Sequence, residues 1–211
     1  IDAQPSTPSA PVAGAITQPS CATATGSFTI TSFESTSTYT FTPSATVDGS
    51  GVVTLAAGAT YTFTETNADG CISPSSSNVV IDAQPSTPSA PVAGAITQPT
   101  CAVATGSFTI TSFESTSTYT FTPTGPTVDG SGVVTLAAAA TYTFRETNAD
   151  GCISPSSSNV VIDAQPSTPS APVAGAITQP SCAVATGSFT ITSFESTSTY
   201  TFTPSATVDG S

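Results

Sequence analysis

The chain contains no histidine, lysine, methionine or tryptophan, and its single basic side chain is Arg145. A nucleophilic triad needs a base such as histidine, so we expect no catalysis and no enzyme in this stretch. The formal net charge of −12 argues against nucleic acid as a partner, because that binding relies on Lys and Arg neutralising phosphates. The same charge argues against binding to anionic membrane surfaces. These absences point away from catalysis and toward a structural or binding role.

Long apolar runs are also missing. No run approaches the ~20 residues that cross a bilayer, and no secretory signal is visible at Ile1. The first residues match the middle of a sequence segment that recurs later. We therefore expect this sequence to be part of a longer chain, with its signals and anchors outside the given residues.

Repetition is what the sequence does contain. The stretch from Ile81 to Val161 is the unit, Ile1 to Val80 is an earlier copy, and Ile162 to Ser211 is a third copy that stops partway, which gives a period of 80 to 81 residues. Solenoid repeats run roughly 20 to 50 residues. The longer period therefore predicts small independent domains, whose function comes from repetition and not from one active site.

A proline-rich segment separates the copies. The text IDAQPSTPSAP begins at Ile1, Ile81 and Ile162, and its prolines fix φ and favour an extended, semi-rigid joint. The predicted order is a preceding tail and linker (1–11), repeat 1 (12–84), a linker (85–91), repeat 2 (92–165), a linker (166–172) and a truncated repeat 3 (173–211).

Alternating residues predict strands. Phe28 and Ile30 alternate with threonines, as do the aromatic residues of TYTFT at 38–42 and TYTFTET at 60–66, which is the period of half-buried strands. Further short strands are expected near 12–19, at 52–55 and within 75–81, the first at a sheet edge because it ends near Pro19. Sustained helical periodicity is lacking. The pattern predicts an all-β chain of tandem antiparallel Ig-like β-sandwich domains with almost no helix.

The second copy provides the predicted core. In the first copy, Asn67–Gly70 is predicted to form a tight hairpin turn, in which Gly70 takes a positive φ. The corner from Leu136 to Tyr142 is expected to resemble a tyrosine corner, in which the phenol ties back to the backbone, or to be a plain core aromatic. The predicted core residues are Phe108, Ile110, Tyr119, Phe121, Val134, Leu136, Tyr142, Phe144, Ile153, Val160 and Ile162.

Each full copy has two cysteines about 50 residues apart. A pair per repeat in a Ser/Thr-rich chain suggests an oxidising, extracellular setting. We predict Cys21–Cys71 and Cys101–Cys152, with the partner of Cys182 beyond Ser211. A bridge between neighbouring domains, such as Cys21 with Cys152, and free thiols are the alternatives.

The order of strands leaves the cysteine pairing open. Seven strands that alternate in direction would place the two cysteines of one copy at opposite ends of the sandwich. Pairing within a copy is easier if TVDGSG at 46–51 is a loop, because fewer strands then lie between the two cysteines. No metal site is expected, because the chain has no His and no CxxC. No cofactor is expected either.

Two further groups of side chains are candidate sites. Asp48 with Asp69, and Asp129 with Asp150, could bind Ca²⁺, but turn-forming Asx chemistry explains them better. Outward-facing threonines could bind ice or carbohydrate or pack against another fibre, although Thr is also simply a good polar strand former. These threonines are Thr38, Thr40, Thr42, Thr60, Thr62 and Thr64.

One resemblance is specific to these motifs. The spacing of ITQPTCAVATGSF, TYTF, NADGC and NVVIDAQPSTPSAP resembles the tandem Ig-like extracellular repeats of large Bacteroidetes surface adhesins, the SprB-like gliding-motility adhesins exported by the type IX system. The resemblance implies a cell-surface stalk or filament used in adhesion and gliding motility, with other copies of the same repeat as neighbours and lateral fibre contacts as an option. It covers essentially the whole chain and identifies a repeat type, not a ligand.

The leading hypothesis is therefore a structural stalk repeat of a bacterial cell-surface adhesin. A repeated weak carbohydrate- or ice-binding module, which gains avidity by repetition, is one alternative. An accessory Ig-like array in a secreted enzyme is another.

Overall fold

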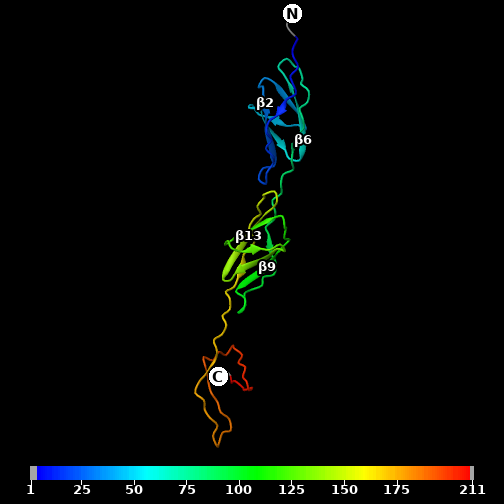
Figure 1. Ribbon diagram of the computed structural model, residues 1–211. Coiled ribbons are helices and arrows are strands. Elements are labelled where there is room, and N and C mark those ends of the chain that lie inside the picture. The colour runs from blue at the N-terminus through cyan, green and yellow to red at the C-terminus, as the bar shows by residue number, and fades with distance from the viewer. Residues whose placement is uncertain (1–3, 210–211) are drawn as a thin grey trace. The chain divides into compact units, whose positions relative to one another are not determined.

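A computed structural model describes residues 4–209 and shows strands and loops, with no helix among those residues (Figure 1). The chain divides into two compact units, 1–165 and 166–211. The first unit contains both complete copies and the second contains the third copy. Within the described part of the chain, no helical segment has the length and apolarity of a membrane crossing.

The first copy folds into two antiparallel sheets, on which Figure 1 labels β2 and β6. One sheet has the order β1-β2-β5-β4 and the other has the order β3-β6-β7. These orders match the ABED and CFG sheets of a constant-type immunoglobulin sandwich. The strands are β1 (Val12–Ala13), β2 (Thr25–Thr31), β3 (Thr38–Thr42), β4 (Thr46–Val47), β5 (Val52–Ala56), β6 (Ala59–Thr66) and β7 (Val79–Ile81).

The second copy repeats this arrangement. Its sheets have the orders β11-β12-β9-β8 and β10-β13-β14. The predicted Ig-like fold is confirmed, and the weak first strand lies at a sheet edge as expected. The strands are β8 (Val92–Ala93), β9 (Thr105–Thr111), β10 (Thr118–Thr122), β11 (Thr127–Val128), β12 (Val133–Ala137), β13 (Ala140–Thr147) and β14 (Val160–Ile162).

Aromatic rings join the two sheets. Phe28 of β2 lies 5.5 Å from Phe63 of β6, measured between ring centroids, and Phe41 lies 4.9 Å from the same ring. Antibody domains place a disulfide between the equivalent strands, with the second cysteine two residues after the corner tyrosine. Phe63 stands two residues after Tyr61 and takes that place. Aromatic side chains therefore occupy the position of the usual inter-sheet disulfide. The cysteines of this chain lie elsewhere in the fold.

The predicted tyrosine corner is present in both copies. The Tyr61 hydroxyl donates to the Ala56 carbonyl at 3.2 Å, and Tyr142 donates to Ala137 at 3.5 Å. A second tie was not predicted: the Tyr39 hydroxyl accepts the Glu34 backbone N–H at 3.1 Å. Burial is the main cause that raises the pKa of Tyr39.

Nine of the predicted core residues are buried in the second copy, and Tyr119 packs against them partly buried. Ile153 was a wrong prediction, because its side chain is 56% exposed. The segment after β13 alternates, so Cys152 and Ser154 point inward and Ile153 points outward.

Buried serines replace part of the last strand. The prediction placed a strand within 75–81, but β7 spans only Val79–Ile81. Before it, the Ser76 N–H donates to the Phe63 carbonyl at 2.8 Å, and the Ser76 hydroxyl oxygen accepts the Phe63 backbone N–H at 3.0 Å. Ser73 bonds to Glu65 in the same way. Because serine side chains serve as ladder groups here, the segment is held along β6 without regular pairing.

The third copy keeps only local structure. Its strands β15 (Val173–Ala174) and β16 (Ile191–Thr192) pair with each other, and the tie from Glu195 N–H to the Tyr200 hydroxyl recurs at 2.8 Å. Phe189, which corresponds to the buried Phe28 and Phe108, is 44% exposed. The second sheet is not formed in the part of this copy that the structure describes.

Candidate functional site: the joint between complete repeats

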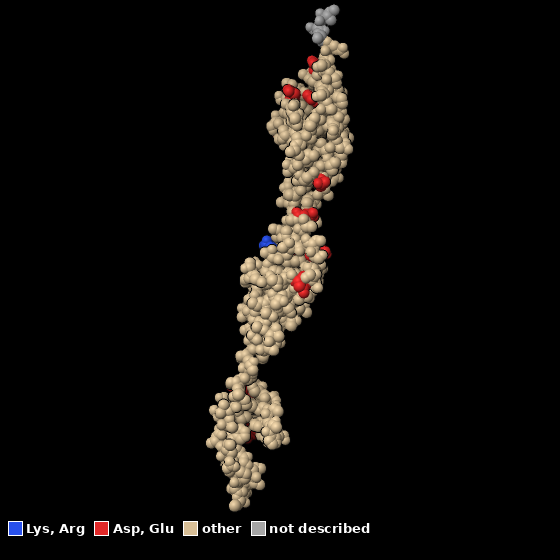
Figure 2. Space-filling model, in the orientation of Figure 1, with Lys and Arg blue, Asp and Glu red and all other residues tan. Residues whose placement is uncertain are grey.

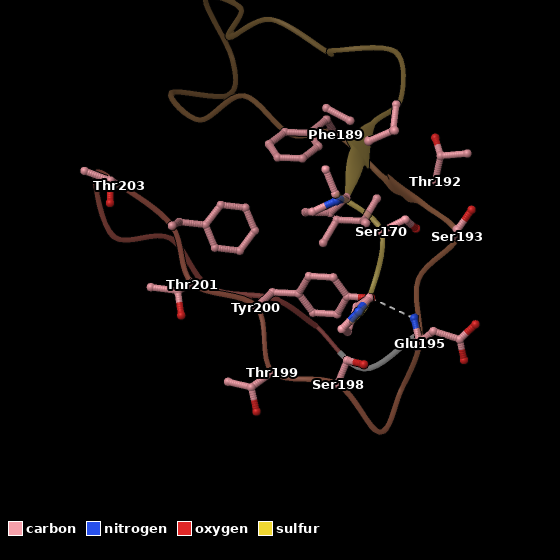
Figure 3. A pocket seen from close by; sticks show the side chains of 17 residues that line it. Ser170, Phe189, Thr192, Ser193, Glu195, Ser198, Thr199, Tyr200, Thr201 and Thr203 are labelled. Carbon is pink, nitrogen blue, oxygen red and sulfur yellow. Dashed lines mark hydrogen bonds between the residues drawn. The ribbon is translucent and has the colours of Figure 1, made fainter. Parts of the chain in front are cut away.

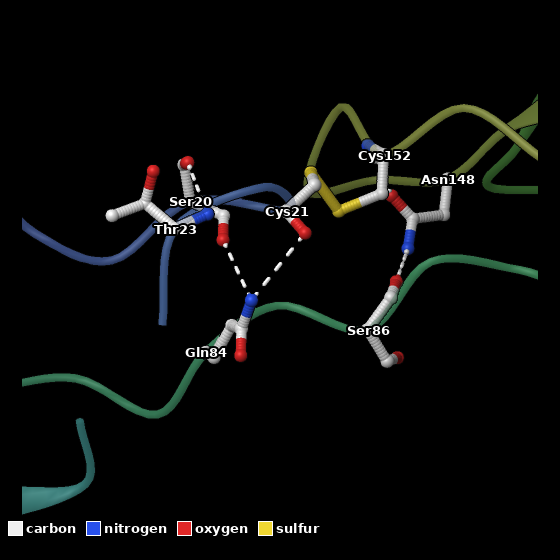
Figure 4. Close-up of a disulfide and its surroundings, with 7 residues drawn as sticks. All are labelled: Ser20, Cys21, Thr23, Gln84, Ser86, Asn148 and Cys152. Carbon is white, nitrogen blue, oxygen red and sulfur yellow. Dashed lines mark hydrogen bonds between the residues drawn. A yellow bond between two sulfur atoms is a disulfide. The ribbon is translucent and has the colours of Figure 1, made fainter. Parts of the chain in front are cut away.

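A disulfide links the two complete copies. It joins Cys21, which precedes β2 in the first copy, to Cys152, which follows the turn after β13 in the second (Figure 4). The two residues are 131 apart in sequence, and their Cα atoms are 5.5 Å apart, which is the separation that unstrained bridges have. The bridge therefore crosses the proline-rich linker.

The predicted pairs Cys21–Cys71 and Cys101–Cys152 are wrong in this structure, and the bridge between neighbouring domains that was the alternative is the one present. Cys21 lies at the end of the sandwich where Ala59 pairs with Ile81, since the Gln84 side chain reaches its carbonyl. Cys71 lies at the opposite end, beside the bridge from Thr66 to Ile72. The eight residues of β6 separate these ends, a length of roughly 24 Å. A disulfide spans no more than about 7 Å between Cα atoms.

Side-chain amides hold the linker to both copies. Gln84 donates through Nε2 to the carbonyls of Ser20 and Cys21, at 3.2 and 3.4 Å, on the first copy. Asn148 of the second copy donates through Nδ2 to the Ser86 carbonyl at 2.9 Å. Figure 4 shows these contacts around the bridge. The start of the linker is therefore hydrogen-bonded on both sides of the disulfide.

Asn148 also fixes the cysteine itself. Its Oδ1 accepts the Cys152 backbone N–H at 2.8 Å, while its Nδ2 bonds to the linker. Cys152 is 0% exposed. The Asn148 side chain thus positions both the turn that contains Cys152 and the linker at Ser86. These contacts join neutral groups, so salt should weaken them little.

A second amide closes the end of the first sandwich. Gln18 donates through Nε2 to the Val80 carbonyl at 3.1 Å and accepts the Asp82 N–H at 3.0 Å. These amide residues were not predicted, because their partners are backbone groups more than 60 residues away. The same amides recur at Gln98, Gln165 and Asn67, and this recurrence was the only sequence signal for their role. Because almost every residue recurs between the copies, the signal did not stand out.

The predicted aspartates form turns. Asp48 Oδ1 accepts the N–H groups of Ser50 and Val52 at 2.8 and 2.9 Å, and the Ser50 hydroxyl at 2.7 Å. The Ser50 hydroxyl bond, followed by these backbone bonds, lowers the pKa of Asp48. Asp129 accepts the equivalent N–H bonds. This is the Asx geometry that the turn interpretation requires, and no metal-binding cluster of three or more His, Cys, Asp or Glu occurs within residues 4–209.

Four of the six predicted threonines lie opposite one another on β3 and β6, whereas Thr38 is opposite Thr66 and Thr60 is opposite Val80. Thr40 pairs with Thr64 and Thr42 with Thr62. In the second copy Arg145 stands opposite Thr120 and interrupts the row. The face of the molecule in Figure 2 shows scattered acidic side chains and no continuous charged patch. The threonine row is thus continuous in the first copy and carries a charged side chain in the second.

The third copy contains a cavity of about 780 Å³ (Figure 3). Phe189, Ile191, Tyr200 and Phe202 line it, and their counterparts Phe108, Ile110, Tyr119 and Phe121 line the core of the second copy. In the complete copies this space holds Val134, Leu136, Tyr142 and Phe144. The cavity therefore lies at the place where the second copy has its packed core.

No family model matches the chain, and no curated protein matches it in sequence. Among solved structures, murine CEACAM1b is 11% identical, with a TM-score of 0.41 over 73% of this chain and 98% of that one. An intimin fragment in complex with the intimin-binding domain of the translocated intimin receptor is 15% identical, with a TM-score of 0.41 over 71% and 62%. The Biofilm associated protein BSP domain is 17% identical, with a TM-score of 0.24 over 73% and 29%. These likenesses are too weak to carry an argument about function.

Proposed function

We propose that this chain is a non-catalytic stalk segment of an extracellular adhesin, in which the disulfide between copies carries tension across each joint. The observation that carries the proposal is the Cys21–Cys152 bridge over the linker. A covalent bond across a joint has no use in a binding module that works one domain at a time. It is useful where neighbouring domains are pulled apart.

The bridge changes the path that a pulling force takes. Tension applied at the two ends passes along residues 1–21, through the disulfide, and on from Cys152. Residues 22–151 lie inside the closed loop. Strands β2 to β13 are therefore shielded, and unfolding them cannot lengthen the chain while the bridge is intact.

Single-molecule stretching of the oxidised 211-residue chain tests this role. At about 3.3–3.6 Å per residue, the loop of 131 residues hides roughly 430–470 Å of contour length. Adding a reductant under load should make that whole length extensible, as the two copies within the loop unfold. The double variant Cys21→Ser/Cys152→Ser should show no reductant-dependent gain of this size.

Other results would contradict the stalk role. Pairing within each copy would hide two loops of about 50 residues, and reduction would release two steps of roughly 165–180 Å each. Full extension without any reductant-dependent step would mean that no bridge protects the domains. Either result would remove the tension-bearing joint from the account.

The finer role follows from the resemblance to SprB-like gliding adhesins of Bacteroidetes. By this resemblance we propose a repeat at the cell surface that is exported by the type IX system and used in gliding motility. The two disulfide-forming cysteines and the Ser/Thr-rich surface support an oxidising, extracellular location. Antibodies raised against residues 92–165 should label intact cells that make the full protein. Labelling only after lysis would contradict the surface location.

The threonine row supports a second candidate function, weak carbohydrate binding. Its supporting observation is the register that places Thr40 opposite Thr64 and Thr42 opposite Thr62. The substitution Thr64→Arg would copy the natural interruption at Arg145 into the first copy. A glycan array at high valency should lose signal with this variant, with Thr25→Arg on the other sheet as a control. No binding by the unaltered chain would remove this candidate.

A further inference from the structure

We propose a pairing rule for longer chains, in which the first cysteine of every copy bonds to the second cysteine of the following copy. By this rule Cys71 takes the first cysteine of a preceding copy, and Cys101 takes the second cysteine of a completed third copy. The inference rests on the proposed stalk function and specifies its partner chemistry, a further copy of the same repeat.

The half of the joint that contains the second cysteine recurs in the first copy. Asn67 Oδ1 accepts the Cys71 N–H at 2.8 Å, and Asn67 Nδ2 donates to the Ser6 carbonyl at 3.0 Å. Asn148 makes the same two bonds to Cys152 and Ser86 in the bridged joint. Cys71 is therefore already held in the conformation, and against the linker, in which Cys152 is bridged.

The other half recurs at the end of the second copy. Gln165 Nε2 donates to the carbonyls of Thr100 and Cys101, both at 3.2 Å. Gln84 makes the equivalent bonds to Ser20 and Cys21 in the bridged joint. The backbone at Cys101 and its linker thus has the arrangement found at Cys21.

Burial distinguishes the bridged cysteines from their counterparts. Cys152 is fully buried, whereas Cys71 is half-buried. Cys21 is half-buried, whereas Cys101 is exposed. The two counterparts are thus more accessible than the cysteines that they match in the bridged joint.

Each bridge forms by exchange with an external disulfide, such as oxidised glutathione. One cysteine thiolate attacks that disulfide, and its partner then displaces the external sulfur. A new protein S–S bond forms, and the external disulfide leaves as two thiols that carry the two electrons and two protons. The reaction needs no other oxidant.

The rule makes successive loops overlap. The loop from Cys21 to Cys152 contains Cys101, from which the next loop would begin before the first has closed. Between its first and last bridges, a long chain would then have no backbone position at which a single cut separates the two ends. Pairing within each copy would leave every linker open to such a cut.

The test uses the full 211-residue chain, extended after Ser211 by a copy of residues 132–165 that completes the third repeat. The protein is oxidised in a glutathione buffer, digested without reduction and analysed by mass spectrometry. We expect Cys101 linked to the added cysteine, beside the Cys21–Cys152 link. In the control Cys101→Ser, the added cysteine should become available to an alkylating reagent.

The possible failures are distinguishable. A link between Cys182 and the added cysteine, or between Cys71 and Cys101, together with an intact Cys21–Cys152 link, would overturn the rule and leave the stalk function standing. Loss of the Cys21–Cys152 link as well would overturn both. Alkylation of the added cysteine in the unaltered extended chain would also overturn the rule.

Discussion

The third copy and the second copy have nearly the same sequence up to Ser211, yet they fold differently. Phe108 is 3% exposed and lies 5.4 Å from the ring of Phe144. Phe189, its counterpart, is 44% exposed, and its ring partner is Phe202 at 6.2 Å. The 211-residue sequence ends before the position that would correspond to Phe144. Identical residues therefore have different environments because their partners come from later in the chain.

The difference separates local from long-range stabilisation. The pairing of β15 with β16 and the tie from Glu195 to Tyr200 survive in the third copy, and both join residues close in sequence. The sheet β10-β13-β14 and the strand β12 have no counterpart among the residues of the third copy up to position 209, which are those that the structure describes. Closing the sandwich depends on these later strands, so a copy is stable only as a whole.

Completing the third copy should have the largest effect. Adding a copy of residues 132–165 after Ser211 should bury Phe189 and fill the cavity, giving this copy a free energy of unfolding of about 4–12 kcal/mol. Amide exchange at 189–192 should then slow by about 10³-fold or more. The same extension carrying Phe144→Asp in the added copy is the control. Fast exchange in both chains would show that the missing strands do not close the sandwich.

Equivalent truncations should sharpen the comparison. Phe108→Ala should lower the free energy of unfolding of the second copy by about 3–5 kcal/mol, because it leaves a cavity in a packed core. Phe189→Ala should change the free energy of unfolding measured for the whole 211-residue chain by less than about 0.5 kcal/mol. Denaturant unfolding followed by circular dichroism measures both. Equal effects would mean that the third copy is packed as tightly as the second.

A glycine pair tests the packing at one end of the complete copies. Gly132 has φ +79° and a Cβ placed there would lie 2.5 Å from the Phe113 ring, whereas a Cβ on Gly130 meets nothing within 4 Å. Gly132→Ala should destabilise the second copy by about 2–4 kcal/mol, through left-handed strain and overpacking. Gly130→Ala should cost less than about 1 kcal/mol. Thermal unfolding of both variants measures the difference, and equal melting temperatures would contradict this geometry.

The smallest predicted effect compares the first and second copies. Ala139 has φ +59° where the first copy has Gly58 at φ +74°. A left-handed alanine costs roughly 1–2 kcal/mol, offset in part by the greater chain entropy of glycine. Ala139→Gly should therefore stabilise the second copy by about 0.5–1 kcal/mol in denaturant unfolding. A loss of stability would show that this turn is not strained.

Much of the fold was predictable because strands and turns are local. The alternation around Phe28 and Ile30 predicted β2, and Gly70 takes the positive φ of 83° that its turn requires. The fate of Ile153 was not predictable, because serine side chains replace ladder bonds in that segment. A pattern of apolar residues cannot predict a segment that is held along a strand by serine hydroxyl groups.

The cysteine pairing shows where sequence reasoning ended. Five cysteines at regular spacing are compatible with bridges within or between copies. Only the position of each cysteine along the sandwich decides, and that depends on the length and direction of β6. Because Phe28 and Phe63 already occupy the usual inter-sheet position, the Ig-like fold itself gave no reason to place a disulfide inside one domain.

The most direct test is a cysteine map of the unaltered, oxidised 211-residue chain. Free thiols are blocked, the chain is digested without reduction, and the linked peptides are identified by mass. The account predicts one peptide pair that joins Cys21 to Cys152, lost after reduction. A pair that joins Cys21 to Cys71 would contradict it, because every domain would then be closed on itself and the joint would be held by the linker alone.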